Sequence, residues 1–463
     1  MLMSFYIKRI EAYGLHNRFN ITLNFKSDIN VIYGRNGTGK TTILHIIANI
    51  LNGSIDRFKY LSFREIRIIT NEDNVIEIYQ YKKQNEIHLL LNGKDIHKID
   101  INRPKRPLSL REEEILMKKS DQGNTKELQE KLKVETPAYF PAFRTMIEAW
   151  ASNQSSEEAA FVNNARYRLG RTSSENLNTI AREFFGRFVP NLSYRSLDVL
   201  ETELTREIER ATFKVAKSSQ DILSEAFVEA FNSVLLKKEN EIPDSVEQLL
   251  DDIDDLYQKI REKDILKGSL TDTSSDVYGR ISNMIASARN ELPKDRDAAA
   301  RVLAVYRKSL REQNKIQTET YAPFEQYVDS VNKFLEGKQI AFLRRNISLK
   351  FEDQTTAPLQ VLSSGERQIV SMLYAASPTL ATPGNIVLID EPEISLHLDW
   401  QRKLLGEMMQ QLGKRQIIVC THSPEIGANY LDAYQEVLPQ PYLYGLSEVA
   451  MSISDSEDVD EEQ

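Results

Sequence analysis

The residues with the clearest chemical potential form a glycine loop near the N-terminus. Its glycines let the backbone turn tightly with N–H groups facing inward, Lys40 adds a positive charge, and Thr41 offers a hydroxyl to Mg²⁺. The spacing matches G-x-x-x-x-G-K-[ST] completely. We therefore predict an ATP-binding phosphate loop made of Gly34, Arg35, Asn36, Gly37, Thr38, Gly39, Lys40, Thr41 and Thr42.

A second group of reactive residues follows an apolar run, NIVLIDEPE, far along the chain. Asp390 ends this run and is placed to hold Mg²⁺ through water, with Thr41 as its companion, while Glu391 is placed to polarise an attacking water. Glu393 is the alternative base because the sequence repeats the glutamate after Pro392. Alone, DEP is also a common turn at the end of a strand.

A histidine and a serine pair complete the candidate site. RQIIVCTHSPE predicts a buried strand that delivers His422, where a histidine can hydrogen-bond a γ-phosphate and sense its loss. Taken singly, it is more often a satisfied histidine at a strand end. LSSGERQ would place Ser363, Ser364 and the backbone of Gly365 at a helix N-terminus that favours anions, and its spacing to Glu366 also fits a capping box.

Apolar spacing predicts the elements that hold the glycine loop. Residues 29–33 read as an apolar strand that enters the loop, and a helix opens at Lys40. Until Gly53 its apolar residues recur at helical spacing: Ile43, Leu44, Ile46, Ile47, Ile50 and Leu51. The loop thus lies between a strand and a helix, as the motif requires.

Other strands are predicted on both sides of this core. Residues 5–10 and 21–25 are short strands, and residues 62–100 alternate apolar with polar side chains between turns, which predicts an antiparallel meander. The strand pattern returns at 346–351, before the second group of reactive residues.

Residues from about 150 to 340 are helical in pattern almost throughout. Apolar residues over 246–260 follow a and d spacing for about two heptads, and 196–236 and 297–314 are amphipathic too. The prolines at 242–243 and 292–293 break the run. We expect a compact helical insertion or short hairpin arm, and the lack of C-x-x-C excludes a zinc hook. The expected parts are an N-terminal lobe (1–150), the insertion (151–345), a C-terminal lobe (346–446) and an acidic tail (447–463).

Composition narrows the class of protein. Acidic residues exceed basic ones by nine, and the tail at 447–463 holds seven acidic residues and no basic one. The rest of the chain therefore has no overall excess of positive charge with which to bind nucleic acid. The single cysteine, Cys420, excludes an intramolecular disulfide and suits the reducing cytosol. No signal peptide or membrane span is recognisable. We expect a cytoplasmic protein whose tail is a solvated end.

Several arginines have open roles. Arg144 follows the aromatic turn AYFPAF, from which it could reach a phosphate or a carboxylate, but a surface arginine beside an aromatic core corner fits as well. The remaining arginines are weak candidates for a basic surface that receives an acidic, DNA-like protein: Arg166, Arg168, Arg171 and Arg195.

Taken together and in order, these motifs resemble those of the ABC-type ATPases. GRNGTGKTT resembles Walker A, LSSGE the signature, IVLIDE Walker B, SLHLD the D-loop and THS the switch histidine, over residues 1–60 and 340–430. The resemblance implies an α/β P-loop head with an antiparallel β subdomain, in which two protomers sandwich ATP and the partner supplies Ser363. Ser364 replaces the usual first glycine of the signature and Glu366 its glutamine, and Gln80 is one candidate for the Q-loop glutamine.

Within that superfamily the chain looks most like the overcoming-lysogenization-defect-type ATPases of phage defence, and most of all like the AriA family of the PARIS systems. Many of them carry a Toprim nuclease domain after the segment that matches THSPEI, and we expect no such domain in this chain. The resemblance therefore implies a separate AriB-like Toprim effector, which the ATPase restrains until a phage-encoded trigger protein, a DNA mimic in that resemblance, arrives. It also implies a homo-oligomer, at least a dimer, with a hexameric ring as one option.

A different function class competes with this one. RecF-like or zinc-hook-type DNA-repair ATPases share these motifs and act on DNA ends or gaps. DNA binding stays open but is not favoured, because a DNA clamp gains affinity mainly from lysine and arginine contacts to phosphate. A transport ATPase ranks third, since its nucleotide domain would be shorter and would lack the helical insertion.

Overall fold

The computed structural model divides the chain into two compact units. The sheet unit comprises Met1–Tyr194 with Tyr374–Gln463, and the helical unit comprises Arg195–Leu373. The structure describes residues 5–101, 130–131, 136–144, 173–192, 197–235, 245–264, 283, 296–343, 346–377, 385–411, 413 and 415–442. The four weakly predicted arginines, the proline breaks and the acidic tail lie outside these ranges, and the predicted domain boundaries stay predictions.

A parallel sheet lies at the centre of the sheet unit. Its strand order is β14-β3-β13-β12-β8, and every neighbouring pair runs parallel. β12 and β13 are buried along their whole length, which matches their uninterrupted apolar sequences. The strands are β3 (Ile29–Tyr33), β8 (Ala138–Phe140), β12 (Ile386–Asp390), β13 (Gln416–Thr421) and β14 (Tyr434–Glu436). The predicted strand 29–33 is confirmed.

A second, seven-stranded sheet of the same unit has the order β15-β2-β1-β4-β5-β6-β7. Its strands are β1 (Ile7–Leu15), β2 (Phe19–Asn24), β4 (Glu65–Thr70), β5 (Val75–Tyr81), β6 (Glu86–Leu91), β7 (Lys94–Asp100) and β15 (Gln440–Pro441). The antiparallel pairing of β4 to β7 confirms the predicted meander. β1 extends five residues beyond the predicted 5–10, through a register shift between Ala12 and Leu15 where Gly14 adopts φ 65°.

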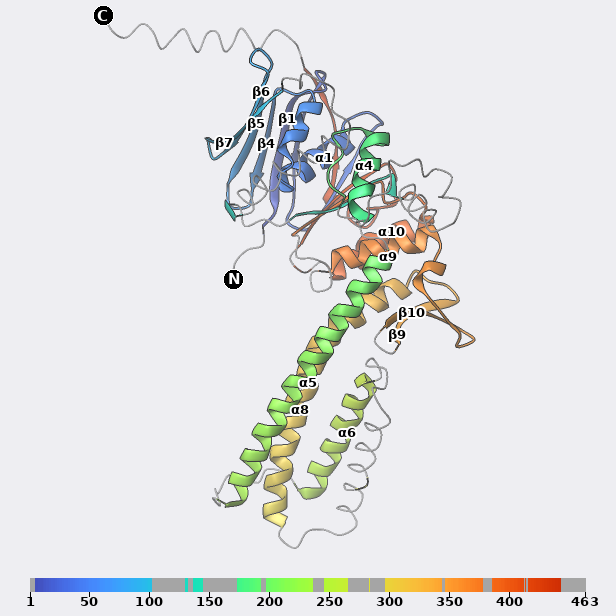
Figure 1. The fold of residues 1–463 in the computed structure, drawn as a ribbon. Helices are drawn as coiled ribbons and strands as arrows, with labels where there is room; N and C mark the ends of the chain where they lie inside the picture. Colours follow the sequence, from blue (N-terminus) through green and yellow to red (C-terminus); the bar gives the residue numbers. More distant parts are fainter. Residues whose placement is uncertain are drawn as a thin grey trace, which may run out of the picture. The chain divides into compact units, whose positions relative to one another are not determined.

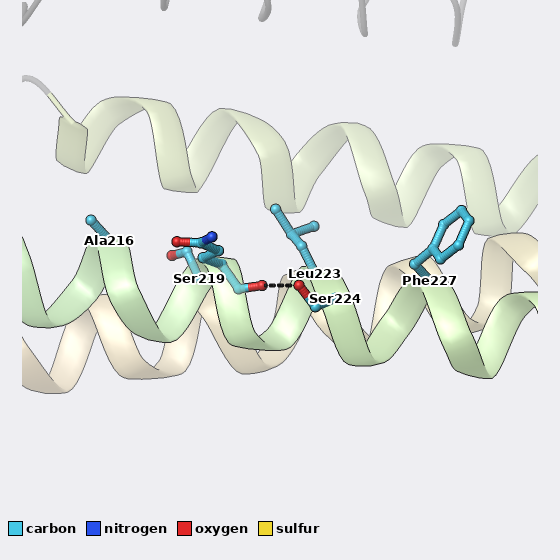
Figure 2. Close-up of a pocket in the computed structure, with 6 residues that line it drawn as sticks. Ala216, Ser219, Leu223, Ser224 and Phe227 are labelled. Atoms are coloured by element: carbon cyan, nitrogen blue, oxygen red, sulfur yellow. Dashed lines mark hydrogen bonds between the residues drawn. The ribbon is translucent and has the colours of Figure 1, made fainter.

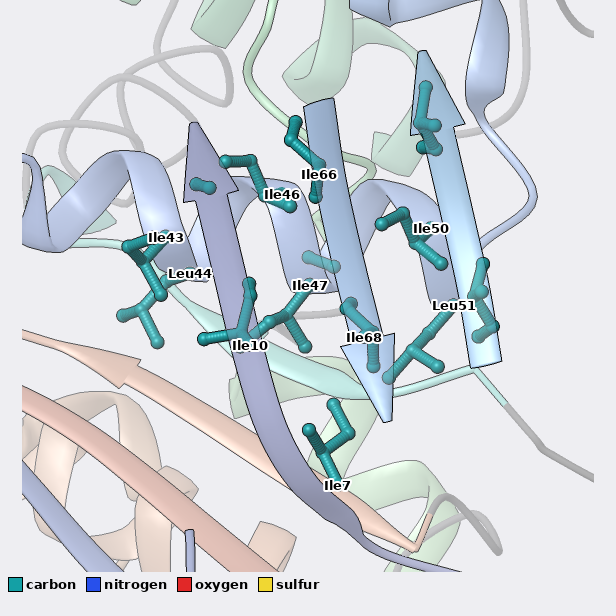
Figure 3. Close-up of a cluster of buried hydrophobic side chains, with 14 of the residues drawn as sticks. Ile7, Ile10, Ile43, Leu44, Ile46, Ile47, Ile50, Leu51, Ile66 and Ile68 are labelled. Carbon is teal, nitrogen blue, oxygen red and sulfur yellow. The ribbon is translucent and has the colours of Figure 1, made fainter. Parts of the chain in front are cut away.

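Helix α1 (Lys40–Leu51) carries the glycine loop on its N-terminus and is buried along most of its length. Figure 3 shows its apolar residues packed with Ile7, Ile10, Ile66 and Ile68 of β1 and β4. The 3₁₀ helix η1 (Ile55–Tyr60) follows and places Phe58 against Phe63 and Phe188. The unit is completed by α4 (Ser173–Phe185), α10 (Leu398–Gln411) and η5 (Leu431–Ala433). This core fixes the position of the loop.

Long helices dominate the helical unit. α5 (Leu197–Leu235) and α8 (Arg296–Asn332) lie side by side, and α6 (Val246–Asp264) packs on α8 through Val246, Leu249, Leu250, Ile253 and Ile260 (Figure 1). The a and d stripe predicted over 246–260 thus packs against a neighbouring helix. The rest of the described unit is β9 (Lys338–Leu343), β10 (Asn346–Phe351), β11 (Thr356–Ala357), η4 (Leu359–Val361) and the start of α9 (Ser364–Ala376). The predicted strand 346–351 is confirmed.

Helix α5 exposes an apolar face. Phe213, Phe227 and Phe231 are 72%, 73% and 58% exposed, although Val215 between them is buried. Ala216, Leu223 and Phe227 line one side of a shallow groove of about 590 Å³, beside a turn in which Ser224 donates to the carbonyl of Gln220 at 2.9 Å (Figure 2). None of the helices in the described ranges is long and apolar enough to cross a membrane.

Candidate nucleotide site

The glycine loop follows β3 and wraps around the ammonium group of Lys40. That group donates to the carbonyls of Gly34 at 2.8 Å and Arg35 at 3.0 Å, and burial lowers its pKa against the opposing effect of nearby acidic groups. Gly37 and Gly39 have φ angles of 77° and 94°, which side-chain-bearing residues rarely adopt. The loop therefore has the glycines its conformation requires, and its N–H groups can face an anion at the start of α1.

Thr41 and Asp390 meet although they lie 349 residues apart. The Thr41 hydroxyl is 3.1 and 3.0 Å from the two carboxylate oxygens of Asp390. Burial raises the pKa of Asp390 to about 7, while the hydroxyl of Thr41 and the charge of Arg144 act in the opposite direction. A hydroxyl and a buried carboxylate are hard oxygen ligands, so this donor pair fits a magnesium ion.

Glu391 adopts a strained backbone at the carboxyl end of β12. Its φ is 47°, in the left-handed region, and its N–H donates to the carbonyl of Cys420 at 2.8 Å. The left-handed turn aims its carboxylate at His422, whose Nε2 lies 3.7 Å from Oε1 of Glu391. The two residues predicted to act on water and on the γ-phosphate thus face one another across neighbouring strands.

Glu393 contacts the loop after β13, residues 421–423, which we name the switch loop. Its carboxylate accepts hydrogen bonds from the Thr421 hydroxyl at 2.8 Å and from the backbone N–H groups of His422 at 2.7 Å and Ser423 at 3.1 Å. Gln401 of α10 contacts the same loop, accepting from the Ser423 hydroxyl at 2.6 Å. The sequence offered no signal for Gln401.

Arg144 is buried rather than a surface arginine. Only 1% of it is exposed, and its guanidinium donates to the carbonyls of Pro141 (3.0 Å), Asp390 (3.2 Å) and Glu391 (3.3 Å). Neither role foreseen for it describes this arrangement. β8, which pairs with β12, delivers the arginine to the end of the strand that carries the carboxylates. Its observed contacts position the backbone of both acidic residues.

Two further polar residues complete the picture of the sheet unit. His16, in the turn between β1 and β2, has φ 53° and its Nε2 lies 3.2 Å from the Thr42 hydroxyl. The motifs gave no prediction for His16, although its place between the first two predicted strands was a usable signal. The side-chain oxygen Oε1 of Gln80 accepts from the N–H of Phe63 at 3.1 Å, so this side chain holds the chain segment that enters β4.

The signature segment, residues 362–368, begins α9 in the helical unit. Ser363 and Glu366 form the capping box that the sequence allowed: the Ser363 N–H donates to the Glu366 carboxylate at 2.7 Å, and Lys338 donates to the same carboxylate at 3.0 Å. Burial acts to raise the pKa of Glu366, but these hydrogen bonds outweigh it and lower that pKa. Ser363 and Ser364 stay exposed at the helix N-terminus, and their role at a nucleotide stays a prediction.

Two of the comparisons with known proteins indicate an ATPase domain. A family model described as an AAA ATPase domain matches residues 7–426. The Retron Ec83 probable ATPase of Escherichia coli is 29% identical over 136 residues, which cover 27% of this chain and 24% of that protein. The chromosome partition protein Smc of Fusobacterium nucleatum is 30% identical over 79 residues, or 17% of this chain and 7% of that protein.

Solved Smc head domains also match. The Smc head domain with an extended coiled coil, from Pyrococcus furiosus, gives a TM-score of 0.39 at 14% identity and covers 98% of this chain and 100% of that one. The SMC head domain from Thermotoga maritima gives a TM-score of 0.35 at 10% identity and covers 94% and 98%.

Proposed function

Because this chain belongs to the AAA ATPase domain family, we propose that it is the ATP-hydrolysing subunit of a bacterial anti-phage defence complex that restrains a separate nuclease. The observation that carries the ATPase part is the convergence of Lys40, Thr41, Asp390, Glu391 and His422 at the carboxyl ends of three adjacent parallel strands. Ligands bind at this edge of open α/β sheets. In this proposal these residues supply a phosphate cradle, a metal-binding pair and a base.

ATP and Mg²⁺ are the cofactors that this arrangement fits. The glycine loop and Lys40 would hold the β- and γ-phosphates, and Thr41 with Asp390 would hold the magnesium ion, which neutralises charge that develops on the phosphates. Glu391 would orient and polarise the attacking water, and His422 would contact the γ-phosphate. Arg144 would keep the two acidic residues in place.

We also propose that the working form is a homo-oligomer of at least two subunits with ABC-type composite sites. The exposed Ser363 and Ser364 begin a helix in the helical unit, where unsatisfied N–H groups favour an anion. In this proposal the serines of one subunit complete the phosphate site of another.

The defence role rests on the retron ATPase as a relative and on the motif resemblance to PARIS-type ATPases. In this role an AriB-like Toprim nuclease is the effector and a phage protein is the trigger. A DNA-acting repair ATPase is the second candidate, and it is favoured by the match to a chromosome partition protein.

One experiment separates these candidates. The tagged chain is purified from its native cells with and without Mg-ATP, beside a Lys40→Ala variant, and ATP hydrolysis and bound macromolecules are measured. We expect hydrolysis that Lys40→Ala abolishes and a copurifying nuclease, with no cleavage of DNA or RNA by the chain alone. Hydrolysis that persists in Lys40→Ala would overturn the ATP site, and copurified DNA without a nuclease would favour the repair candidate.

A further inference from the structure

We propose that Glu393 is a positioning residue that clamps the switch loop, so that His422 faces Glu391, and that it is not the base. This inference rests on the proposed ATP hydrolysis. Glu391 and Glu393 of DEPE lie two residues apart and both lie near the switch loop. The inference follows from the different contacts that their two carboxylates make.

The hydrogen bonds of Glu393 already occupy both of its oxygens. Oε1 accepts the N–H groups of His422 and Ser423, and Oε2 accepts the Thr421 hydroxyl. A general base needs an accessible lone pair directed at a water molecule. Among the described residues no N–H or O–H donates to the Glu391 carboxylate, which is about one-third exposed and faces His422 at 3.7 Å. Glu391 is therefore the glutamate able to receive a proton.

A second contact fixes the same loop from the other side. Gln401 accepts from the Ser423 hydroxyl and donates to the carbonyl of Leu396 at 3.0 Å, and Leu396 lies in the segment that follows Glu393. The Leu396 N–H in turn donates to the carbonyl of Glu393 at 3.0 Å. These hydrogen bonds form a closed ring that runs from Glu393 to the switch loop, on to Gln401 and Leu396, and back to Glu393. The switch loop therefore has little freedom to shift.

Rigidity at this place has a chemical consequence. Glu393 accepts the backbone N–H of His422 and so fixes the backbone of the residue that carries the imidazole ring. Loss of the clamp would let this ring move away from Glu391 and from a γ-phosphate. Misplacement by about 1 Å can cost about a hundredfold in rate.

Glutamine at position 393 distinguishes a clamp from a base. Its carbonyl oxygen can accept both backbone N–H groups, and its amide can donate to the Thr421 hydroxyl. That hydroxyl can then donate to the carbonyl of Ser423, which lies 3.3 Å away. Glutamine keeps the clamp but cannot take up a proton, whereas alanine removes the clamp.

Steady-state ATP hydrolysis by the full chain provides the test. For Glu393→Gln we expect a kcat within about threefold of wild type, and for Glu393→Ala a loss of about tenfold to a hundredfold in kcat with a small change in KM. Glu391→Gln should lose about a hundredfold or more while still binding ATP. Glu425→Gln is the matched control: it changes a half-buried carboxylate near the same loop, paired with Arg402 at 2.6 Å, and should leave the rate unchanged.

The pH profile adds a readout that folding does not affect. If Glu393 only positions the loop, wild type and Glu393→Gln share the same acidic limb of kcat against pH. Loss of activity in Glu393→Gln to the level of Glu391→Gln, or loss of that limb, would overturn the inference, as would wild-type activity in Glu393→Ala. If Glu393→Ala does not fold, the pair Glu393→Gln and Glu391→Gln still decides. Absence of ATPase activity in the wild-type chain would contradict the proposed function instead.

Discussion

Two phenylalanines show how differently the two units are built. Phe58 of the sheet unit is fully buried, with ring centroids of Phe63 and Phe188 5.8 and 5.3 Å away. Phe227 of the helical unit is 73% exposed and stacks only on Phe231 at 6.4 Å among the described residues. In the sheet unit the apolar side chains around α1 are enclosed, whereas in the helical unit one face of α5 is open.

The difference follows the chemistry that each unit performs. At the nucleotide site, residues distant in sequence must be positioned to a precision of about 0.5 Å. This precision requires a close-packed core behind each element. A long helix needs one apolar stripe to pack on its neighbour, and its other face is free to vary. Equivalent substitutions in the two units should therefore have different effects on stability and activity.

The largest effect expected is the recovery of activity when two inactive variants are mixed. The proposed composite site combines the sheet unit of one subunit with the helical unit of another, so each variant can supply the part that the other has lost. Lys40→Ala disables the glycine loop of the sheet unit, and Ser363→Arg disables the signature segment of the helical unit. If sites are composite, a mixture contains one intact site per heterodimer, and ATP hydrolysis should rise well above either variant alone. Mixtures that stay inactive after proven subunit exchange would indicate sites formed within one chain.

Phe58→Ala should produce the largest loss of stability. Removing a fully buried phenyl ring leaves a cavity and costs about 3–5 kcal/mol. Trp400 belongs to the sheet unit, so urea unfolding followed by tryptophan fluorescence measures this change. A loss below about 1 kcal/mol would contradict the close packing of this core.

The sequence predicted those features that depend on local spacing. The helix from Lys40, the meander and the strand 346–351 each carry their own period of apolar residues. The Ser363–Glu366 capping box was visible for the same reason, because its partners are three residues apart.

Long-range contacts were the part that spacing could not supply. Arg144 reaches the carbonyls of Asp390 and Glu391 only because β8 pairs with β12, and a strand of three residues gives no sequence signal for such a pairing. The clamp from Glu393 to the switch loop depends in the same way on β12 and β13 lying side by side. The motifs predicted which residues are reactive, but the contacts that hold those residues in place depend on the strand order of the sheet.

Arg144→Lys tests whether the arginine positions the acidic residues. The three carbonyls are reached from two nitrogens of the planar guanidinium, whereas a lysine presents its three donors from a single nitrogen, so we expect at least one buried carbonyl to lose its hydrogen bond. We expect a loss of about 1–3 kcal/mol in stability and a fall in kcat larger than the change in KM for ATP. An unchanged kcat would indicate that these carbonyls do not align the carboxylates.

Glycines with positive φ provide a matched comparison between the units. Gly39 has φ 94°, and a Cβ there would lie 3.1 Å from Cδ1 of Ile21. Gly337 of the helical unit has φ 67° with open space around it. Alanine at either site pays about 1–2 kcal/mol for the left-handed backbone, and at position 39 it must also displace a core side chain. We expect Gly39→Ala to lose more stability and to weaken ATP binding, measured by calorimetry, whereas Gly337→Ala leaves ATP affinity unchanged. Equal effects on ATP affinity would contradict this assignment.

The smallest effect is expected at Phe227, and it tests the open face directly. Phe227→Ala removes a ring that is mostly in water already, so little buried area is lost. Alanine also favours a helix more than phenylalanine does, by about 0.5 kcal/mol. These two terms nearly cancel, and the free energy of unfolding, measured by urea titration with circular dichroism of the helices, should change by less than about 0.5 kcal/mol. Phe58→Ala in the same titration provides the contrast. A loss of about 2 kcal/mol or more at Phe227 would mean that this face is covered in solution, and the contrast between the enclosed core around α1 and the open face of α5 would no longer hold.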